Sequence, residues 1–122
     1  MNKYLDLVED ILERTYKGSL HWQQVANDKH AQQISEPWNV IRQFEATFPF
    51  NGEPATLLCV EKRVYIYEYL FPHEDRMCEL LILSGGEIIK TVGAPFLPWY
   101  WLSKFGDIIA KVCEVPAVPK LA

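Results

Sequence analysis

Residues 56–71 read TLLCVEKRVYIYEYLF. Apolar side chains alternate onto both faces of an extended chain on either side of the charged triplet Glu61–Arg63, as in strands that are buried on both faces. We therefore expect two central strands here, joined by a tight turn at the triplet. A central pair of this kind predicts a sheet whose remaining strands lie in the flanking sequence.

Further strands are predicted on both sides of this central pair. Residues 40–48 alternate between apolar and polar side chains, which is typical of a strand with one face on the core. MCELLILS (77–84) and EIIKTVG (87–93) also have strand composition, and the Gly85–Gly86 pair between them is typical of a two-residue hairpin turn. PFNGEP (49–54) and PHEDR (72–76) are rich in turn residues and should form loops.

Residues 19–37 allow two interpretations. SLHWQQVAND (19–28) and HAQQIS (30–35) could form a hairpin with a turn at residues 27–29. A single helix over residues 20–34 is the alternative, because glutamine and alanine favour a helix. We favour the hairpin.

A helix is predicted at each end of the chain. Apolar side chains cover half the circumference of residues 2–17, and Gly18 stands where a left-handed residue commonly ends a helix. Residues 98–113 carry a second apolar stripe, and Pro98 suits the first position of that helix. Since each helix has a broad apolar face, we expect both to cover the same face of the sheet.

The predicted fold class is therefore α+β: an antiparallel β-meander of about five to seven strands, with an N-terminal and a C-terminal helix packed on one face. A chain of 122 residues suits one domain. We expect residues 1–115 to form that domain. Residues 116–122 contain two prolines and should form an extended C-terminal tail.

Composition narrows the classes of function. The chain is 49% hydrophobic and has a net charge of -4, which argues against nucleic acid as a partner and favours a basic protein partner. Its N-terminus has no continuous apolar segment, and no apolar run is long enough for a membrane span. We expect a cytoplasmic protein without membrane or cofactor. Its three cysteines are separated in apolar sequence and should be reduced and buried.

Several ionisable residues fall inside predicted strands. Arg42 lies on the core face of its strand and needs a partner or a position at the edge of the sheet. Glu61, Glu68 and Glu79 could align for acid–base chemistry, but pairing with basic neighbours such as Arg42, Lys62 and Arg63 is the favoured interpretation. His73 precedes two carboxylates, a combination that can bind metal or transfer protons. A solvated turn explains it better, so we predict no enzyme, no catalytic residue and no metal site.

Aromatic residues at the start of the second helix suggest a binding surface. Trp99 and Tyr100 either seal the rim of the helix against the sheet or form part of an interface, where such residues are common anchors. Gly106 and Ala110 leave room for a large ring or another close neighbour. With the acidic pair Glu74 and Asp75, the aromatic residues Trp99 and Tyr100 are our candidate partner-binding residues.

Four residues carry a resemblance to other proteins. Thr15, Gly18, Leu20 and Trp22 follow the first helix in a pattern that resembles small uncharacterised bacterial α+β proteins. The size, the acidity and the lack of a catalytic set also resemble immunity proteins, which neutralise bacterial toxins. The resemblance implies an antiparallel sheet after the helix and transfers no functional residue.

These observations predict a small cytoplasmic protein-protein binding module, with an immunity-type inhibitor of a toxin as the particular case. The alternative is a small-ligand-binding protein that uses a groove between the sheet and the helices. Arg42 or Glu68 would then supply polar groups, and the aromatic ladder of Tyr65, Tyr67, Tyr69 and Phe71 would line the groove. Either function is compatible with a homodimer.

Overall fold

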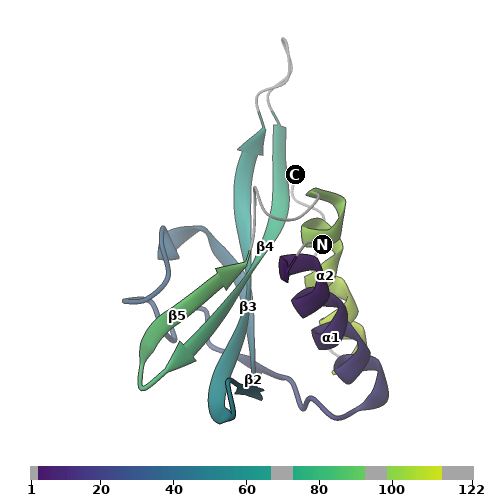
Figure 1. The fold of residues 1–122 in the computed structure, drawn as a ribbon. Helices are drawn as coiled ribbons and strands as arrows, with labels where there is room; N and C mark the ends of the chain where they lie inside the picture. Colours follow the sequence, from purple (N-terminus) through teal and green to yellow (C-terminus); the bar gives the residue numbers. More distant parts are fainter. Residues whose placement is uncertain (1–2, 67–72, 93–98, 114–122) are drawn as a thin grey trace.

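A computed structural model describes residues 3–66, 73–92 and 99–113 of the chain. The fold is α+β, with one antiparallel sheet and a helix near each end of the chain (Figure 1). In chain order the elements are α1 (Lys3–Lys17), β1 (Gln23–Val25), the 3-10 helix η1 (Pro37–Asn39), β2 (Val40–Phe50), β3 (Glu53–Ile66), β4 (His73–Ser84), β5 (Glu87–Val92) and α2 (Trp99–Val112).

The described strands form a meander in the order β1-β2-β3-β4-β5, and each pairs antiparallel with its neighbours. Five strands lie at the lower end of the predicted range. The predicted α+β class, antiparallel sheet and terminal helices are confirmed. The expected tail, residues 116–122, lies outside the described residues, as do Glu68 and three members of the aromatic ladder, Tyr67, Tyr69 and Phe71.

The predicted turn at Glu61–Arg63 is wrong. β3 continues through the triplet, and Glu61 pairs with Arg42 of β2 on one side and with Cys78 of β4 on the other. The triplet contains none of the residues that favour turns, and the side chains of Glu61 and Lys62 are buried with partners. The charges of the triplet suggested a turn exposed to solvent, but the neighbouring strands instead supply partners for Glu61 and Lys62.

The predicted hairpin turn at Gly85–Gly86 is confirmed, and the turn within the predicted loop at 49–54 is shorter than expected. Asn51 and Gly52 both have positive φ, as do Gly85 and Gly86, which matches the two-residue turns whose twist suits an antiparallel pair. Only Asn51 and Gly52 of the loop predicted at 49–54 therefore lie outside the strands. The predicted loop at 72–76 is also wrong for residues 73–76, because these residues begin β4.

The predicted hairpin within residues 19–37 is wrong, and so is the alternative of a single helix. Only Gln23–Val25 forms a strand, and its partner is β2 rather than residues 30–35. Residues 27–34 instead follow a series of turns, in which His30 has a φ of 64°. Turn bonds such as that from the Lys29 N–H to the Ala26 carbonyl replace the expected ladder.

The four residues of the Thr15–Trp22 pattern end α1 and attach the following chain to the core. Gly18 has a φ of 77°, and the N–H groups of Ser19 and Leu20 both donate to the carbonyl of Arg14, as in a glycine-terminated helix. Trp22 is buried, and its indole Nε1–H donates to the hydroxyl of Thr15 over 2.9 Å. These contacts give the pattern a structural role.

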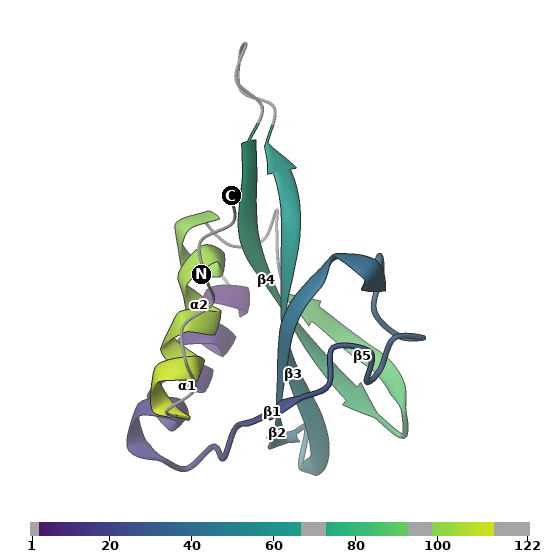
Figure 2. The same cartoon turned by 180° about the vertical axis from the view of Figure 1, so that it is seen from behind.

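The main core joins both helices to the sheet. Buried residues of α1, α2, β2, β3 and β4 form one apolar cluster, and Figures 1 and 2 show the two helices side by side. Among the members with almost no exposed surface are Val8, Ile11, Phe44, Leu57, Ile82, Phe105 and Ile109. A smaller cluster contains the intervening strand residues Leu58, Val60, Leu81 and Leu83 together with Ile34. The sheet thus buries apolar side chains of both alternating sets.

Candidate functional site

Four charged side chains from β2, β3, β4 and α2 meet in what we call the Arg42 network: Arg42, Glu61, Arg76 and Asp107. Arg42 binds Glu61 through two nitrogens, with Nη2 2.9 Å from Oε1. The same Nη2 donates to Asp107 over 2.7 Å, and Arg76 binds both oxygens of Asp107 at 3.2 and 3.0 Å. Three strands are therefore linked to α2 by charge-assisted hydrogen bonds.

The centre of the Arg42 network is buried, whereas its rim is partly exposed. The side chains of Arg42 and Glu61 are 3% and 0% exposed, and those of Arg76 and Asp107 are 26% and 45% exposed. Burial alone would lower the pKa of Arg42, but its hydrogen bonds to Glu61 and Asp107 outweigh burial and raise it. These contacts keep Arg42 a cation. The prediction that Arg42 needs a partner is confirmed.

Gly106 allows the Arg42 network to lie against the backbone of α2. A Cβ at this position would lie 1.8 Å from Oε1 of Glu61, closer than any two such atoms can approach. The N–H of Gly106 also approaches Sγ of Cys78 to 3.2 Å. The close neighbour predicted for this small residue is therefore the Glu61 carboxylate.

The hydrogen-bonding groups of the network are largely satisfied by one another. All four carboxylate oxygens of Glu61 and Asp107 accept from an arginine. Nη1 of Arg42 has no hydrogen-bond partner among the described residues, but its guanidinium lies 5.4 Å from the ring of Phe44. Glu79 similarly pairs with Lys62 over 2.8 Å, so the favoured pairing is confirmed for Glu61 and Glu79.

Two buried thiols lie next to the network. Cys59 and Cys78 are buried and Cys113 is half-buried, and all three are free. Hydrogen bonding with Cys78 and burial raise the pKa of the Cys59 thiol well above its usual range, and burial also raises the pKa of Cys113. A thiol held neutral in this way is a poor nucleophile.

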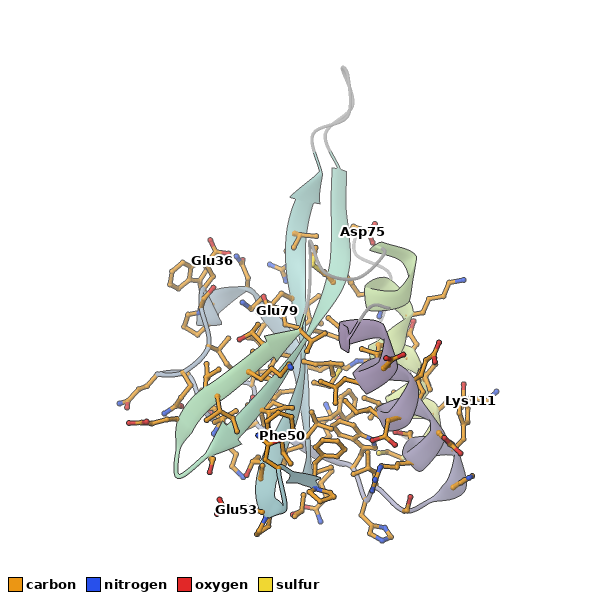
Figure 3. The ribbon with its side chains drawn as sticks, viewed as in Figure 1. Glu36, Phe50, Glu53, Asp75, Glu79 and Lys111 are labelled. Carbon is orange, nitrogen blue, oxygen red and sulfur yellow. The ribbon has the colours of Figure 1, made fainter. Side chains whose placement is uncertain are left out.

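The predicted partner-binding residues lie on two elements that the network connects. Glu74 and Asp75 belong to β4, and Trp99 and Tyr100 form the start of α2. Figure 3 shows Asp75 at the end of the sheet opposite to Glu53, and Oδ1 of Asp75 accepts from the N–H of Arg76 over 2.7 Å. The side chains of the other three residues lie outside the described part, so their assignment stays a prediction.

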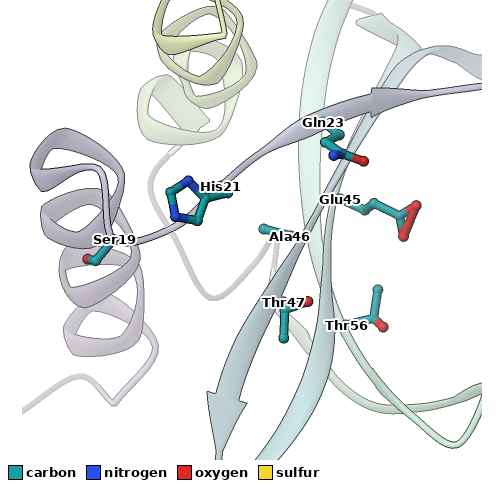
Figure 4. A pocket seen from close by; sticks show the side chains of 7 residues that line it. All are labelled: Ser19, His21, Gln23, Glu45, Ala46, Thr47 and Thr56. Carbon is teal, nitrogen blue, oxygen red and sulfur yellow. The ribbon is translucent and has the colours of Figure 1, made fainter.

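A polar hollow of about 310 Å³ lies where β1 and β2 separate. We call it the edge hollow, and Figure 4 shows the side chains around it. Its lining consists of Ser19, His21, Gln23, Glu45, Ala46, Thr47 and Thr56. Our sequence reasoning missed it, although Pro49 and Pro54 face each other two residues beyond Thr47 and Thr56.

A second, more apolar hollow of about 410 Å³ is lined by Tyr16 of α1 and by Ile108, Lys111 and Val112 of α2. Tyr16 is 68% exposed. The groove that we considered between sheet and helices is not this hollow. In the described part of that interface the core side chains are buried against one another and Arg42 is bound by Glu61 and Asp107.

The described residues contain no group of three or more histidine, cysteine, aspartate or glutamate side chains arranged to hold a metal ion. No described helix is both long enough and apolar enough to cross a membrane. No protein-family model matches the chain, and comparisons with curated proteins and with solved structures likewise found no match.

Proposed function

We propose that this chain is a small cytoplasmic protein-protein binding module, with both helices packed on one face of its sheet. One observation carries the proposal: Arg76 and Asp107 join β4 to α2 through two hydrogen bonds. These are the elements that bear Glu74, Asp75, Trp99 and Tyr100. A surface whose two halves are fixed before binding loses less conformational entropy when a partner docks.

The charge of the chain supports a basic partner. Its net charge is -4, and opposite charge on a partner accelerates encounter and suppresses binding of other proteins. Aromatic residues beside acidic ones then supply the apolar anchors of the contact. An immunity-type inhibitor that blocks a basic toxin is the particular case that we propose.

Affinity capture from the host with matched variants tests this proposal. The site variant combines Trp99→Ala, Tyr100→Ala, Glu74→Gln and Asp75→Asn. The control variant combines Trp38→Ala, Tyr16→Ala, Glu53→Gln and Glu87→Gln, which remove exposed aromatic and acidic groups elsewhere. We expect wild type and control to capture one stoichiometric basic protein at low salt, and the site variant to lose it. Retention by the site variant would show that the four residues are not the binding surface.

The alternative of a small-ligand-binding protein, with its groove between sheet and helices, is the weaker proposal. The polar group expected in that groove, Arg42, already binds two carboxylates. A thermal-shift screen against metabolites separates the two functions, because a ligand that binds the folded state raises the melting temperature. A metabolite that does so would favour the alternative.

A further inference from the structure

Half of the outer edge of β2 lacks a neighbouring strand. β1 pairs only with Gln43, Phe44 and Glu45, whereas β2 continues to Phe50. No other described strand lies on that side, since β1 is the first strand of the sheet and β3 pairs with the opposite edge. The backbone beyond Glu45 is therefore an open edge within the described chain.

Two prolines reveal which backbone groups point outward from that edge. Pro49 lies opposite Pro54 in the β2–β3 register, and neither has an N–H, so this pair cannot exchange hydrogen bonds. Antiparallel pairs alternate between bonded and non-bonded. Because the register is regular here, Thr47 opposite Thr56 is also non-bonded. The N–H and C=O of Thr47 therefore point away from β3 and toward the open side.

The edge hollow lies along this open edge. Its lining includes Ala46, which belongs to the main apolar core, and also Glu45 and Thr47, which alternate onto the other face of β2. Residues of both faces can border one hollow only where it meets the strand edge, as Figure 4 shows for Ala46 and Glu45. The hollow thus lies in line with β1, on the side of Gln23 where β1 begins.

The other half of the same edge is covered by this chain itself. The side chain of Asn27 donates to the carbonyl of Ile41 over 2.9 Å. The side chain of Gln43 donates to the carbonyls of Ala26 and Lys29 at 3.0 and 2.7 Å. Folded proteins commonly protect sheet edges in this way. The outward N–H and C=O of Thr47 take no part in these protective contacts.

We propose that the edge hollow binds an extended, basic segment of a partner protein, which adds to the sheet as a strand beside Thr47. The inference rests on the proposed protein-binding function and gives it a second surface. Main-chain hydrogen bonds to Thr47 supply affinity, as in other strand additions. Ser19, Gln23 and Thr56 offer further polar contacts.

Charge selects a basic segment. Glu45 is the formally charged side chain in the lining, and this side chain is 19% exposed. It now binds Lys29, whose side chain is 49% exposed, and lies 3.6 Å from Nε2 of His30. An exposed ion pair contributes little to stability. A lysine or arginine of the added strand can therefore replace Lys29 beside Glu45.

The test uses two probes on the full chain: the capped peptide acetyl-TKVTVKT-amide and its counterpart with glutamate in place of lysine. Binding is followed by NMR titration of the backbone amides and by hydrogen exchange at Thr47. We expect the lysine peptide to slow exchange at Thr47 by at least about tenfold and to bind about fivefold or more tightly than the glutamate peptide.

Three variants separate backbone pairing from side-chain contact. Thr47→Pro removes the outward N–H and should abolish binding, whereas Thr47→Val keeps that N–H and should bind. Glu45→Gln should remove the preference for lysine, and the control Glu87→Gln on β5 should retain it. If Thr47→Pro fails to fold, exchange at Thr47 in wild type still decides the question.

The inference is overturned if neither peptide binds, if saturating lysine peptide leaves exchange at Thr47 unchanged, or if Thr47→Pro binds as wild type does. Concentration-dependent protection of Thr47 in the free protein would also overturn it, because the occupant would then be a second copy. If Thr47→Pro still captures the basic host protein and the Trp99 site variant does not, the proposed function stands and only the edge inference fails.

Discussion

The Arg42 network and the edge hollow are both polar, but they differ in how their hydrogen-bonding groups are satisfied. In the network, every carboxylate oxygen of Glu61 and Asp107 accepts from an arginine. In the hollow, the backbone N–H and C=O of Thr47 face an edge with no described neighbouring strand. A buried polar cluster that satisfies itself fixes a structure, whereas an open edge has capacity left for a partner.

The sharpest test of this comparison removes one member of the network. Glu61→Leu leaves Arg42 buried without its principal partner, so the free energy of unfolding should fall by about 3–5 kcal/mol. The double variant Arg42→Met with Glu61→Leu removes both charges and should recover most of that loss. Denaturant unfolding measures both, and an equal loss in the two variants would contradict the assignment of Arg42 as the unpaired charge.

Gly106→Ala tests the close approach of Glu61 to α2. An added methyl group in mid-helix normally stabilises by up to about 1 kcal/mol, but here it would overlap the Glu61 carboxylate. We expect a net loss of about 1–3 kcal/mol in denaturant unfolding. In a Glu61→Ala background the same substitution should be neutral or stabilising. A gain in the wild-type background would show that the carboxylate lies elsewhere.

The exposed rim of the network should be less sensitive. Asp107→Asn weakens the bonds to Arg42 and Arg76, and because its side chain is 45% exposed we expect a loss of about 1 kcal/mol. Asp10→Asn is a matched control, since Asp10 is 46% exposed and pairs only with Arg14 among the interactions described. Thermal unfolding of both variants should rank Asp107 above Asp10, and the reverse order would weaken the role given to Asp107.

Substitutions in the edge hollow should have little effect on the free energy of unfolding. Thr47→Val and Thr56→Val change hydroxyl groups that line an open hollow, so each should alter the free energy of unfolding by no more than about 0.5 kcal/mol. Larger losses would mean that these hydroxyls stabilise the folded chain and would remove the contrast between the two clusters.

Sequence reasoning succeeded where local chemistry determines structure. The Gly85–Gly86 turn and the C-terminal end of α1 at Gly18 follow from backbone preferences that a few residues carry. It failed at Glu61–Arg63 because the partners of a buried charge come from distant parts of the chain: Arg42 lies 19 residues away from Glu61, and Asp107 of α2 lies 65 residues from Arg42. The side-chain spacing of β3 alone could not distinguish a turn from an ion-paired strand.

The candidate sites likewise depend on contacts between distant elements, which local sequence does not reveal. That Arg42 needs a partner followed from its place in an alternating strand, but the identity of Asp107 as a second partner required the docking of α2. The edge hollow depends on where β1 begins, and a three-residue strand leaves little signal in the sequence. The Pro49 and Pro54 pair could have indicated an open edge only once their register was known.

Hydrogen exchange of the Thr47 amide in the free protein tests the central claim most directly. Phe44, Ala46 and Phe48 alternate with Thr47 and should donate to β3, so their amides should be protected. We predict that Thr47, by contrast, exchanges within about tenfold of an unprotected amide at every protein concentration. Protection of Thr47 equal to that of Ala46 would show that the edge is already covered and would contradict the claim that it is open to a partner.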